Sequence, residues 1–197
     1  MSGSQRVIGD YELVVIGAGA AGLGAARAAV ARGARTLLVS DREPGGDCTF
    51  TGCVPSKTLI EAARSGVSYP VAAQRICDVI AAIAATEDAD TLRSEGIDVI
   101  LDRARFRSRD RTSAVARSAR RVVIATGSTP AVPDVPGLRE AGFLTNETVF
   151  DLPVLPRSLA IVGGGTIGCE LAQALHRLGS KVIVIEQADR LLPQPGP

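Results

Sequence analysis

Cys48 and Cys53 are the side chains of this sequence best suited to chemistry. Four residues separate them. The other candidates are scattered along the chain: Cys77, Cys169 and the single histidine, His176. Zinc sites prefer a closer cysteine pair that a second pair or histidines complete, so no metal site is expected. Cys77 and Cys169 are predicted to be small buried apolar residues, and His176 to face solvent on a helix.

A structural disulfide and a reversible redox pair are the two other interpretations of Cys48 and Cys53. Closing so small a loop would stabilise the fold by only about 2 kcal/mol, a weak use for a disulfide in a reducing compartment, so we favour the redox pair. A helix is expected to begin near Pro55. Cys53 would then precede its N-terminus, where the helix dipole stabilises a thiolate. Lys57 is either a solvated helix residue or a cation beside that thiolate and an adjacent cofactor.

A glycine-rich turn near the N-terminus has the pattern of a dinucleotide-binding site. Residues 11–16 form an apolar run of strand length, and an alanine-rich helix is expected to reach about Arg32. Between them lie Gly17, Gly19 and Gly22, in a G-x-G-x-x-G spacing. Such glycines permit the tight turn, the approach of backbone to pyrophosphate and close helix–strand packing. Packing without a nucleotide is the alternative, but the strand–turn–helix context favours binding.

The same pattern occurs a second time. A strand is expected at 158–162 and a helix at 169–178, and Gly163, Gly165 and Gly168 lie between them. The free N–H groups and the positive dipole end of each helix can receive a phosphate. Two copies in one chain are much stronger evidence for nucleotide binding than one.

Acidic residues after the second strand of each unit should bind ribose hydroxyls. Glu186 ends the strand expected at 181–186, and its charge favours NAD(H) over NADP(H) because it repels a 2′-phosphate. In the first copy, Ser40 ends the strand expected at 35–40, and Asp41 follows it. Either Asp41 takes the role of the acid, or the ribose is held more weakly.

The rest of the chain completes an alternating pattern of helices and strands. Helices are expected at about 55–64 and at 71–94, the second with a break near Thr86. Short strands are expected at 97–101, 104–107 and 114–117, and a buried strand at 121–126. A proline-rich connection follows at 129–156. The three short strands are interpreted as a small antiparallel meander.

The composition excludes several classes of protein. The chain has 197 residues, of which 46% are hydrophobic and 22% charged, as in an ordinary globular protein. It has no apolar run of about 18 residues that could cross a bilayer, and its short polar N-terminus resembles neither a signal peptide nor a transit peptide. We therefore expect a cytoplasmic protein. The formal net charge of +1 gives no reason to expect nucleic acid.

Residues 45–57, GGDCTFTGCVPSK, resemble the active-site signature of class I pyridine nucleotide–disulfide oxidoreductases. That family includes dihydrolipoamide dehydrogenase, glutathione reductase and mercuric reductase, and the details are most similar to the mercuric reductase-like and dihydrolipoamide dehydrogenase-like branches. The resemblance covers nearly the whole chain in order: the FAD fingerprint, the redox cysteines, the strand end at 125–127 and the NAD fingerprint.

The resemblance implies an α/β fold with two domains. Residues 1–150 would form a Rossmann-like FAD-binding domain with the small antiparallel meander. Residues 151–197 would begin a second Rossmann-like domain, for NAD, which is incomplete. Family members are roughly twice this length or longer, beyond a single domain, so we expect a fragment or a truncated product. The homodimer interface domain, with its histidine–glutamate pair, would be absent, and His176 does not match that histidine.

The resemblance also implies a reaction. NAD(P)H would reduce FAD, the reduced flavin would open a Cys48–Cys53 disulfide, and the resulting thiols would reduce a small disulfide or a metal ion. Cys53 would be the charge-transfer thiolate, Cys48 the interchange thiol, and Lys57 would lie by the flavin and pair with Glu170. The implied cofactor contacts are Gly17, Gly19, Gly22, Ser40, Asp41, Gly46, Lys57, Thr126 and Gly127 for FAD, and Gly163, Gly165, Gly168 and Glu186 for the nicotinamide nucleotide.

Two other functions compete with this one. Without the general base of the interface domain, the chain alone is expected to be inactive, so it could be a non-catalytic module that binds FAD or NAD. A flavoprotein that uses oxygen or a quinone without thiols is disfavoured by the cysteine signature. The terminal electron acceptor and the oligomeric state are not readable from the sequence.

Overall fold

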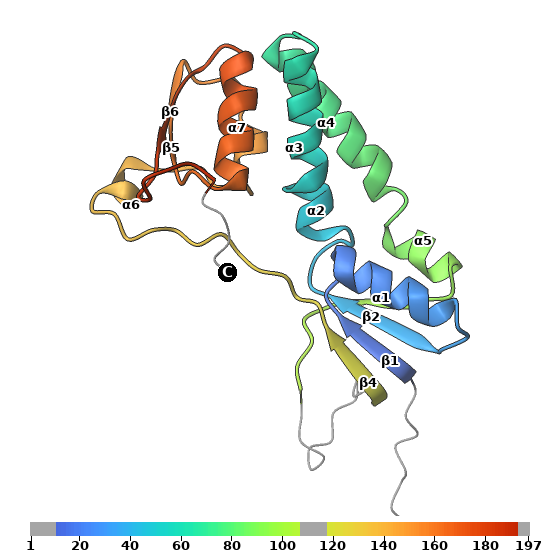
Figure 1. The fold of residues 1–197 in the computed structure, drawn as a ribbon. Helices are drawn as coiled ribbons and strands as arrows, with labels where there is room; N and C mark the ends of the chain where they lie inside the picture. Colours follow the sequence, from blue (N-terminus) through green and yellow to red (C-terminus); the bar gives the residue numbers. More distant parts are fainter. Residues whose placement is uncertain (1–10, 107–117, 193–197) are drawn as a thin grey trace, which may run out of the picture. The chain divides into compact units, whose positions relative to one another are not determined.

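The structure, a computed structural model, describes residues 11–106 and 118–192 (Figure 1). The chain groups into two compact units. The first comprises Met1–Cys48 and Ile83–Ser128, and the second Thr49–Ala82 and Thr129–Pro197. This grouping does not follow the expected domain boundary after residue 150, which stays a prediction.

The first unit contains a four-stranded parallel sheet in the order β3-β2-β1-β4. Its strands are β1 (Tyr11–Ile16), β2 (Thr36–Ser40), β3 (Asp98–Leu101) and β4 (Ala119–Ile124). Val15 of β1 pairs with Leu38 of β2 and Val123 of β4, so these three side chains share one face of the sheet. All four strands are therefore aligned, and their carboxyl ends meet at one edge.

Two helices contribute to the core of the first unit, α1 (Ala20–Val30) and α5 (Ala89–Ser94). The buried core includes Val15, Leu23, Ala26, Leu38, Leu92 and Ile97. Helix α5 begins at a side-chain cap, because the N–H of Thr91 donates a 2.7 Å hydrogen bond to the Asp88 carboxylate. The Arg27 guanidinium of α1 forms an ion pair with Glu95 at 2.7 Å, which ties α1 to the end of α5.

The expected antiparallel meander differs from the structure. β3 lies within the predicted strand 97–101, but it pairs in parallel with β2, so this part of the prediction is wrong. Residues 104–106 form no strand, and the remaining meander residues, 107–117, lie outside the described residues. A parallel pairing is the outcome expected when a helix, rather than a tight turn, connects neighbouring strands.

The second unit combines helices with a two-stranded parallel sheet. Its elements are α3 (Cys53–Arg64), α4 (Tyr69–Ala84), α6 (Leu138–Ala141), the 3-10 helix η1 (Val149–Asp151), β5 (Ser158–Val162), α7 (Thr166–Arg177) and β6 (Lys181–Ile185). A short helix that was not predicted, α2 (Gly46–Phe50), spans the junction between the units. The predicted break in the helical segment near Thr86 is confirmed, because α4 and α5 lie on either side of it.

Helices α3 and α7 lie side by side (Figure 1) and share a core with α4 and the connecting segment. Its buried residues include Leu59, Ala62, Ala63, Ala72, Ile76, Val149, Ala174 and Leu175. The many alanines leave little side chain between the helices and so let the backbones approach closely. Burial raises the pKa of Tyr69, whose hydroxyl donates a 2.9 Å hydrogen bond to the Leu152 carbonyl oxygen.

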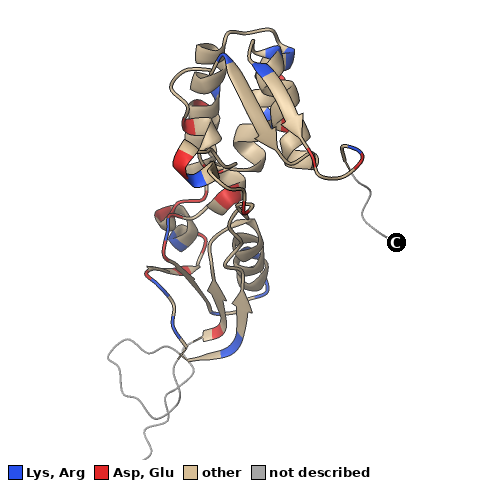
Figure 2. Cartoon of the chain, turned by 90° about the vertical axis from the view of Figure 1, so that its left-hand side faces the viewer, with Lys and Arg blue, Asp and Glu red and all other residues tan. Residues whose placement is uncertain are grey.

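Charged residues of both signs are interspersed along the described residues of each unit (Figure 2). This distribution matches the formal net charge of +1 for the whole chain. None of the helices in the described part of the chain is long and apolar enough to span a membrane.

Candidate functional site

The first glycine turn requires glycine at two positions. Gly17 follows β1 with a φ of +101°, a left-handed conformation that favours glycine. Gly22 lies in the first turn of α1, and a Cβ atom on it would overlap the carbonyl oxygen of Gly17. Strand, turn and helix can therefore pack this tightly only with glycine at both places, as a pyrophosphate-binding turn requires.

Helix α1 directs its N-terminus to this turn. Its N-cap residue, Gly19, provides no side-chain cap, so the N–H groups of the first helical turn are available to an anion. Gly46 packs against Gly19, and a Cβ on Gly46 would lie 2.6 Å from the Gly19 Cα atom. The N–H of Gly45 donates a 2.8 Å hydrogen bond to the Ala18 carbonyl oxygen. We call this arrangement of residues 17–22 and 45–46 the first cradle, and it fits the pyrophosphate of a dinucleotide.

Other residues predicted to contact the first nucleotide lie at the same edge of the sheet. β2 ends at Ser40, which is 9% exposed, and Asp41 is exposed in the bend that follows. Thr126 and Gly127 follow β4, which pairs with β1, so they lie at the carboxyl end of the sheet. A Cβ on Gly127 would lie 3.7 Å from the Oδ2 atom of Asp47. The edge thus gathers backbone and small polar side chains beside the first cradle.

The second glycine turn repeats this geometry in the second unit. Gly163 has a φ of +111°, and a Cβ on Gly168 would overlap its carbonyl oxygen. Gly165 is the N-cap residue of α7 and provides no side-chain cap. We call residues 163–168 the second cradle, and they too fit a pyrophosphate at a helix N-terminus.

Glu186 lies against the second cradle. Its carboxylate accepts hydrogen bonds from the N–H of Gly164 at 2.5 Å and from the N–H of Ala188 at 2.9 Å. The bonds from Ala188 and Gly164 hold the pKa of this carboxyl below its usual range. An ionised carboxylate therefore lies at the end of β6, where a ribose-binding acid is expected.

One pocket of the second unit gathers reactive side chains. Its volume is about 220 Å³, and it is lined by Thr51, Gly52, Cys53, Ser56, Lys57, Asn146, Phe150, Ile167, Glu170 and Leu171. Eight of these ten residues lie in the N-terminal half of α3 or α7 or directly precede α3. The positive dipole ends of both helices thus face one pocket that contains a thiol, an amine and a carboxylate.

The family resemblance implies that Cys53 and Lys57 lie by the flavin and that Lys57 pairs with Glu170, and all three residues line this pocket. Among the described residues, however, Lys57 and Glu170 form no ion pair within 4.0 Å. Lys57 is exposed and Glu170 half-buried. The expected pairing is therefore not made in this structure, although both groups border the same space.

The cysteine segment starts its helix earlier than predicted. α3 begins at Cys53 instead of near Pro55, so Cys53 lies within the first turn rather than before it. Pro55 is tolerated there because first-turn N–H groups have no intrahelical acceptor. Cys48 is half-buried in α2, Cys53 is exposed, and both are thiols in this structure.

The remaining cysteines and the histidine were expected to have no role. Cys77 is exposed, so the prediction that it is buried is wrong. Helix α4 buries the face that carries Ala72 and Ile76, and Cys77 turns out of that face. Cys169 is half-buried, and its thiol donates to the Gly164 carbonyl oxygen at 3.3 Å. His176 is exposed, which confirms the prediction.

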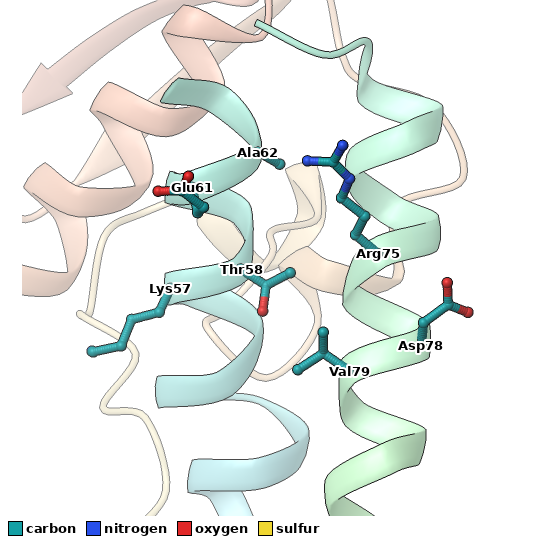
Figure 3. Close-up of a pocket in the computed structure, with 7 residues that line it drawn as sticks. All are labelled: Lys57, Thr58, Glu61, Ala62, Arg75, Asp78 and Val79. Atoms are coloured by element: carbon teal, nitrogen blue, oxygen red, sulfur yellow. The ribbon is translucent and has the colours of Figure 1, made fainter. Parts of the chain in front are cut away.

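A larger cavity of about 410 Å³ lies between α3 and α4, and Figure 3 shows its lining residues. Arg75 extends from α4 toward α3, whereas Lys57 extends away from α4 (Figure 3). The Arg64 guanidinium holds the pKa of Glu61 below its usual value, so this carboxylate is already paired. None of the described residues that line this cavity carries a thiol, and the Thr58 hydroxyl donates a 2.8 Å hydrogen bond to the Val54 carbonyl oxygen, so the smaller pocket is the better candidate for chemistry.

The sequence did not predict that Asn146, Phe150 and Ile167 line the pocket with Cys53. Asn146 and Phe150 come from the proline-rich connection, where no periodic pattern indicates which side chains turn inward. Ile167 lies inside the second glycine motif, at a position whose type the motif leaves open. Only the packing of α3 beside α7 brings these residues together.

Comparison with known proteins identifies relatives over nearly the whole chain. Mercuric reductase of Staphylococcus aureus is 32% identical over 203 residues, which cover 93% of this chain and 37% of the relative. Dihydrolipoyl dehydrogenase of Chlamydia muridarum is 34% identical over 211 residues, which cover 95% of this chain and 45% of the relative. The chain thus spans about two fifths of the length of these relatives.

A solved structure gives the same result for the fold. The Cu(II) complex of an HOCl-induced flavoprotein disulfide reductase from Escherichia coli matches with a TM-score of 0.81 and 32% identity, over 92% of this chain and 43% of that chain. Residues 11–197 match the family model described as pyridine nucleotide-disulphide oxidoreductase. With both cradles and the cysteine segment inside the matched residues, this chain belongs to the pyridine nucleotide-disulphide oxidoreductase family.

Proposed function

We propose that this chain carries the FAD-binding and thiol-bearing part of an NAD(P)H-dependent flavoprotein that reduces a disulfide or a metal ion. Members of this family are enzymes that use FAD and NAD(P)H. The first cradle would hold FAD and the second cradle the nicotinamide nucleotide, with NAD(H) favoured by the charge of Glu186. When bound, FAD accepts two electrons from the reduced nicotinamide nucleotide and passes them to a disulfide.

The observation that carries this proposal is the shared pocket of Cys53, Lys57 and Glu170. The pocket places the Cys53 thiol, in the first turn of α3, beside the same space as an amine one turn later and a carboxylate of α7. Glu170 lies on the helix that opens from the second cradle, so the nucleotide-binding turn and the thiol pocket belong to one packed pair of helices. Neither structural disulfides nor oxygen-using flavoproteins need such a combination.

The chain's own chemistry would be thiol–disulfide exchange. The Cys48 thiolate attacks one sulfur of a disulfide substrate, forms a mixed disulfide and releases the first thiol product. The Cys53 thiolate then attacks the Cys48 sulfur, which releases the second thiol and leaves a Cys48–Cys53 disulfide. Two electrons from NAD(P)H, with its hydrogen and one further proton, restore both thiols. In sum, NAD(P)H, H⁺ and RSSR give NAD(P)⁺ and two RSH.

Thiol counting tests this assignment without relying on turnover. The chain has four cysteines, so the oxidised, FAD-loaded protein should show two thiols after denaturation, those of Cys77 and Cys169. Anaerobic NADH should bleach the visible flavin absorbance and raise the count to four. Cys53→Ser should remove this gain, whereas Cys77→Ser should keep the gain of two.

Other outcomes of that experiment are equally informative. If FAD binds and bleaches but the thiol count stays constant in the wild type, the chain is a flavoprotein without a redox pair. If NADH and FAD bind without any bleaching, the chain is a binding module, and the proposal of electron transfer is wrong. Addition of lipoamide, glutathione disulfide or Hg(II) to the reduced protein then identifies which substrate class reoxidises it.

A further inference from the structure

The two cradles of this chain are internal copies that agree in backbone detail. The N–H of Gly17 donates to the Val39 carbonyl oxygen at 2.8 Å, and the N–H of Gly163 donates to the Ile185 carbonyl oxygen at 2.8 Å. Val39 is the last residue but one of β2, and Ile185 is the last residue of β6. Each bond thus joins a glycine turn to the end of the strand that follows its helix. The residue that follows the acceptor therefore occupies the same place in both units.

Those equivalent residues are Ser40 and Glu186, and they also bond alike. The Ser40 hydroxyl accepts from the N–H two residues later, that of Arg42, at 3.3 Å, and the Glu186 carboxylate accepts from the N–H two residues later, that of Ala188, at 2.9 Å. The difference is chemical. Glu186 is an ionised acceptor with oxygens for ribose hydroxyls, whereas Ser40 is a neutral hydroxyl on a short side chain.

We propose that Ser40 is the residue of the first cradle that faces the adenosine ribose. The first cradle then binds its dinucleotide without a carboxylate that accepts a hydrogen bond from the ribose 2′-hydroxyl. This inference rests on the proposed function only in that FAD is taken as the ligand of the first cradle. The two cradles of the chain then differ in specificity: the second depends on a ribose 2′-hydroxyl, and the first is nearly indifferent to it.

Asp41 does not replace the missing acid. It lies one residue beyond the end of β2, in a bend, and its side chain is exposed. Within this bend the N–H of Arg42 donates to the Ser40 hydroxyl, so Ser40, not Asp41, repeats the hydrogen bond that Glu186 makes in the second unit. The equivalent residue of the second unit is Gln187, which is neutral. An acid at this position is thus no part of the shared cradle geometry.

The neighbouring residue on the turn differs in the same sense. A Cβ on Gly164 would lie 2.5 Å from a side-chain carbon of Leu191 and 3.1 Å from the Glu186 carboxylate, so this position of the second cradle has little room for a side chain. The first cradle has Ala18 at the equivalent position, and Ala18 is 4% exposed. The two cradles therefore also differ at this turn position, with alanine in the first and glycine in the second.

The test compares FAD with its 2′-deoxyadenosine analogue by flavin fluorescence. Wild-type chain should bind the two with dissociation constants within about threefold of each other. Ser40→Glu should bind FAD about tenfold more tightly, because a charged acceptor now meets the 2′-hydroxyl, but should bind the analogue no more tightly. Asp41→Asn tests the competing acid, and neither constant is expected to change, because Asp41 has no acidic equivalent in the second cradle. Glu43→Gln, which removes an exposed charge outside the cradle, is the matched control.

A second variant guards against misfolding, because Ser40 is nearly buried. The pair Ala18→Gly and Ser40→Glu rebuilds the second cradle's combination and should show the same tenfold gain for FAD alone. The inference is overturned if Asp41→Asn weakens FAD about tenfold and spares the analogue, or if wild type already discriminates tenfold. Absence of FAD binding by wild type would overturn the proposed function itself, a result distinct from binding with the wrong preference.

Discussion

The backbone N–H of Gly164 donates a 2.5 Å hydrogen bond to the carboxylate of Glu186, 22 residues further along the chain. The bond joins the turn of the second cradle to the end of β6, so an acid and a phosphate-binding turn are held together before any nucleotide arrives. Glu186 also accepts from the N–H of Ala188, which fixes the carboxylate from a second side. Two backbone donors thus orient the carboxylate that we expect to bind the ribose hydroxyls.

The first prediction concerns nucleotide preference. Glu186→Gln should weaken NAD⁺ binding about tenfold, because the ribose hydroxyls lose a charged acceptor. Binding of NADP⁺ should not weaken, because the repulsion of the 2′-phosphate is removed. Isothermal titration with both nucleotides measures the ratio. Asp189→Asn removes a nearby exposed charge and is the control; an equal loss in both variants would assign the effect to net charge alone.

The second prediction is a pH dependence of stability. The pKa of Glu186 is lowered in the folded chain, chiefly by the N–H groups of Ala188 and Gly164. A lowered folded pKa stabilises the fold above the unfolded value of 4.5, and this contribution is lost as pH falls through the folded value.

Wild type should therefore melt at a higher temperature than Glu186→Gln. This difference should stay constant from neutral pH to about pH 5 and disappear in stronger acid. Thermal unfolding followed by circular dichroism across this range measures it. A difference that grows on acidification would show that the carboxylate is not held in its ionised form.

Local signals allowed much of the fold to be predicted. β1 and β5 begin and end at the predicted residues, because each is an apolar run that a glycine turn stops. Both cradles could be predicted for a related reason. Close packing of strand, turn and helix requires glycine at fixed positions, and this spacing of glycines is recognisable in the sequence. The signature around Cys48 and Cys53 indicates the family by residue types and spacing alone, because the redox pair, its glycines and Pro55 all lie within 13 consecutive residues, 45–57.

Long-range packing could not be predicted in the same way. Nothing near Asn146 indicates that it shares a pocket with Cys53, because the two are joined only through the packing of α3 beside α7. Helix α2 is five residues long and too short to show a helical period. Cys77 was misplaced because a single apolar residue does not reveal which face of α4 is buried.

The third prediction concerns the core that positions the thiol pocket. Leu59 of α3 is 2% exposed and packs in the cluster with Ala174 and Leu175 of α7. Leu59→Ala should lower the free energy of unfolding by about 2–5 kcal/mol, because it leaves a cavity between the helices. Urea denaturation measures this loss.

Leu144 offers a matched control for that experiment. It belongs to the same unit but is 43% exposed, so Leu144→Ala should cost less than about 1 kcal/mol. If the two substitutions cost the same, the α3–α7 contact does not organise the second unit.

The last prediction separates two glycines of the same helix. A Cβ on Gly22 would overlap the Gly17 carbonyl oxygen, whereas a Cβ on Gly24 would meet no atom within 4 Å. Gly22→Ala should therefore force the turn of the first cradle apart and weaken FAD binding by more than about tenfold, because the pyrophosphate loses its backbone donors. Gly24→Ala should bind FAD as wild type does and stabilise α1 by about 0.5–1 kcal/mol, because alanine has the higher helix propensity. Fluorescence titration with FAD and thermal unfolding of both variants distinguish these outcomes, and equal FAD affinity in the two variants would mean that the close approach of Gly22 to Gly17 is not what builds the site.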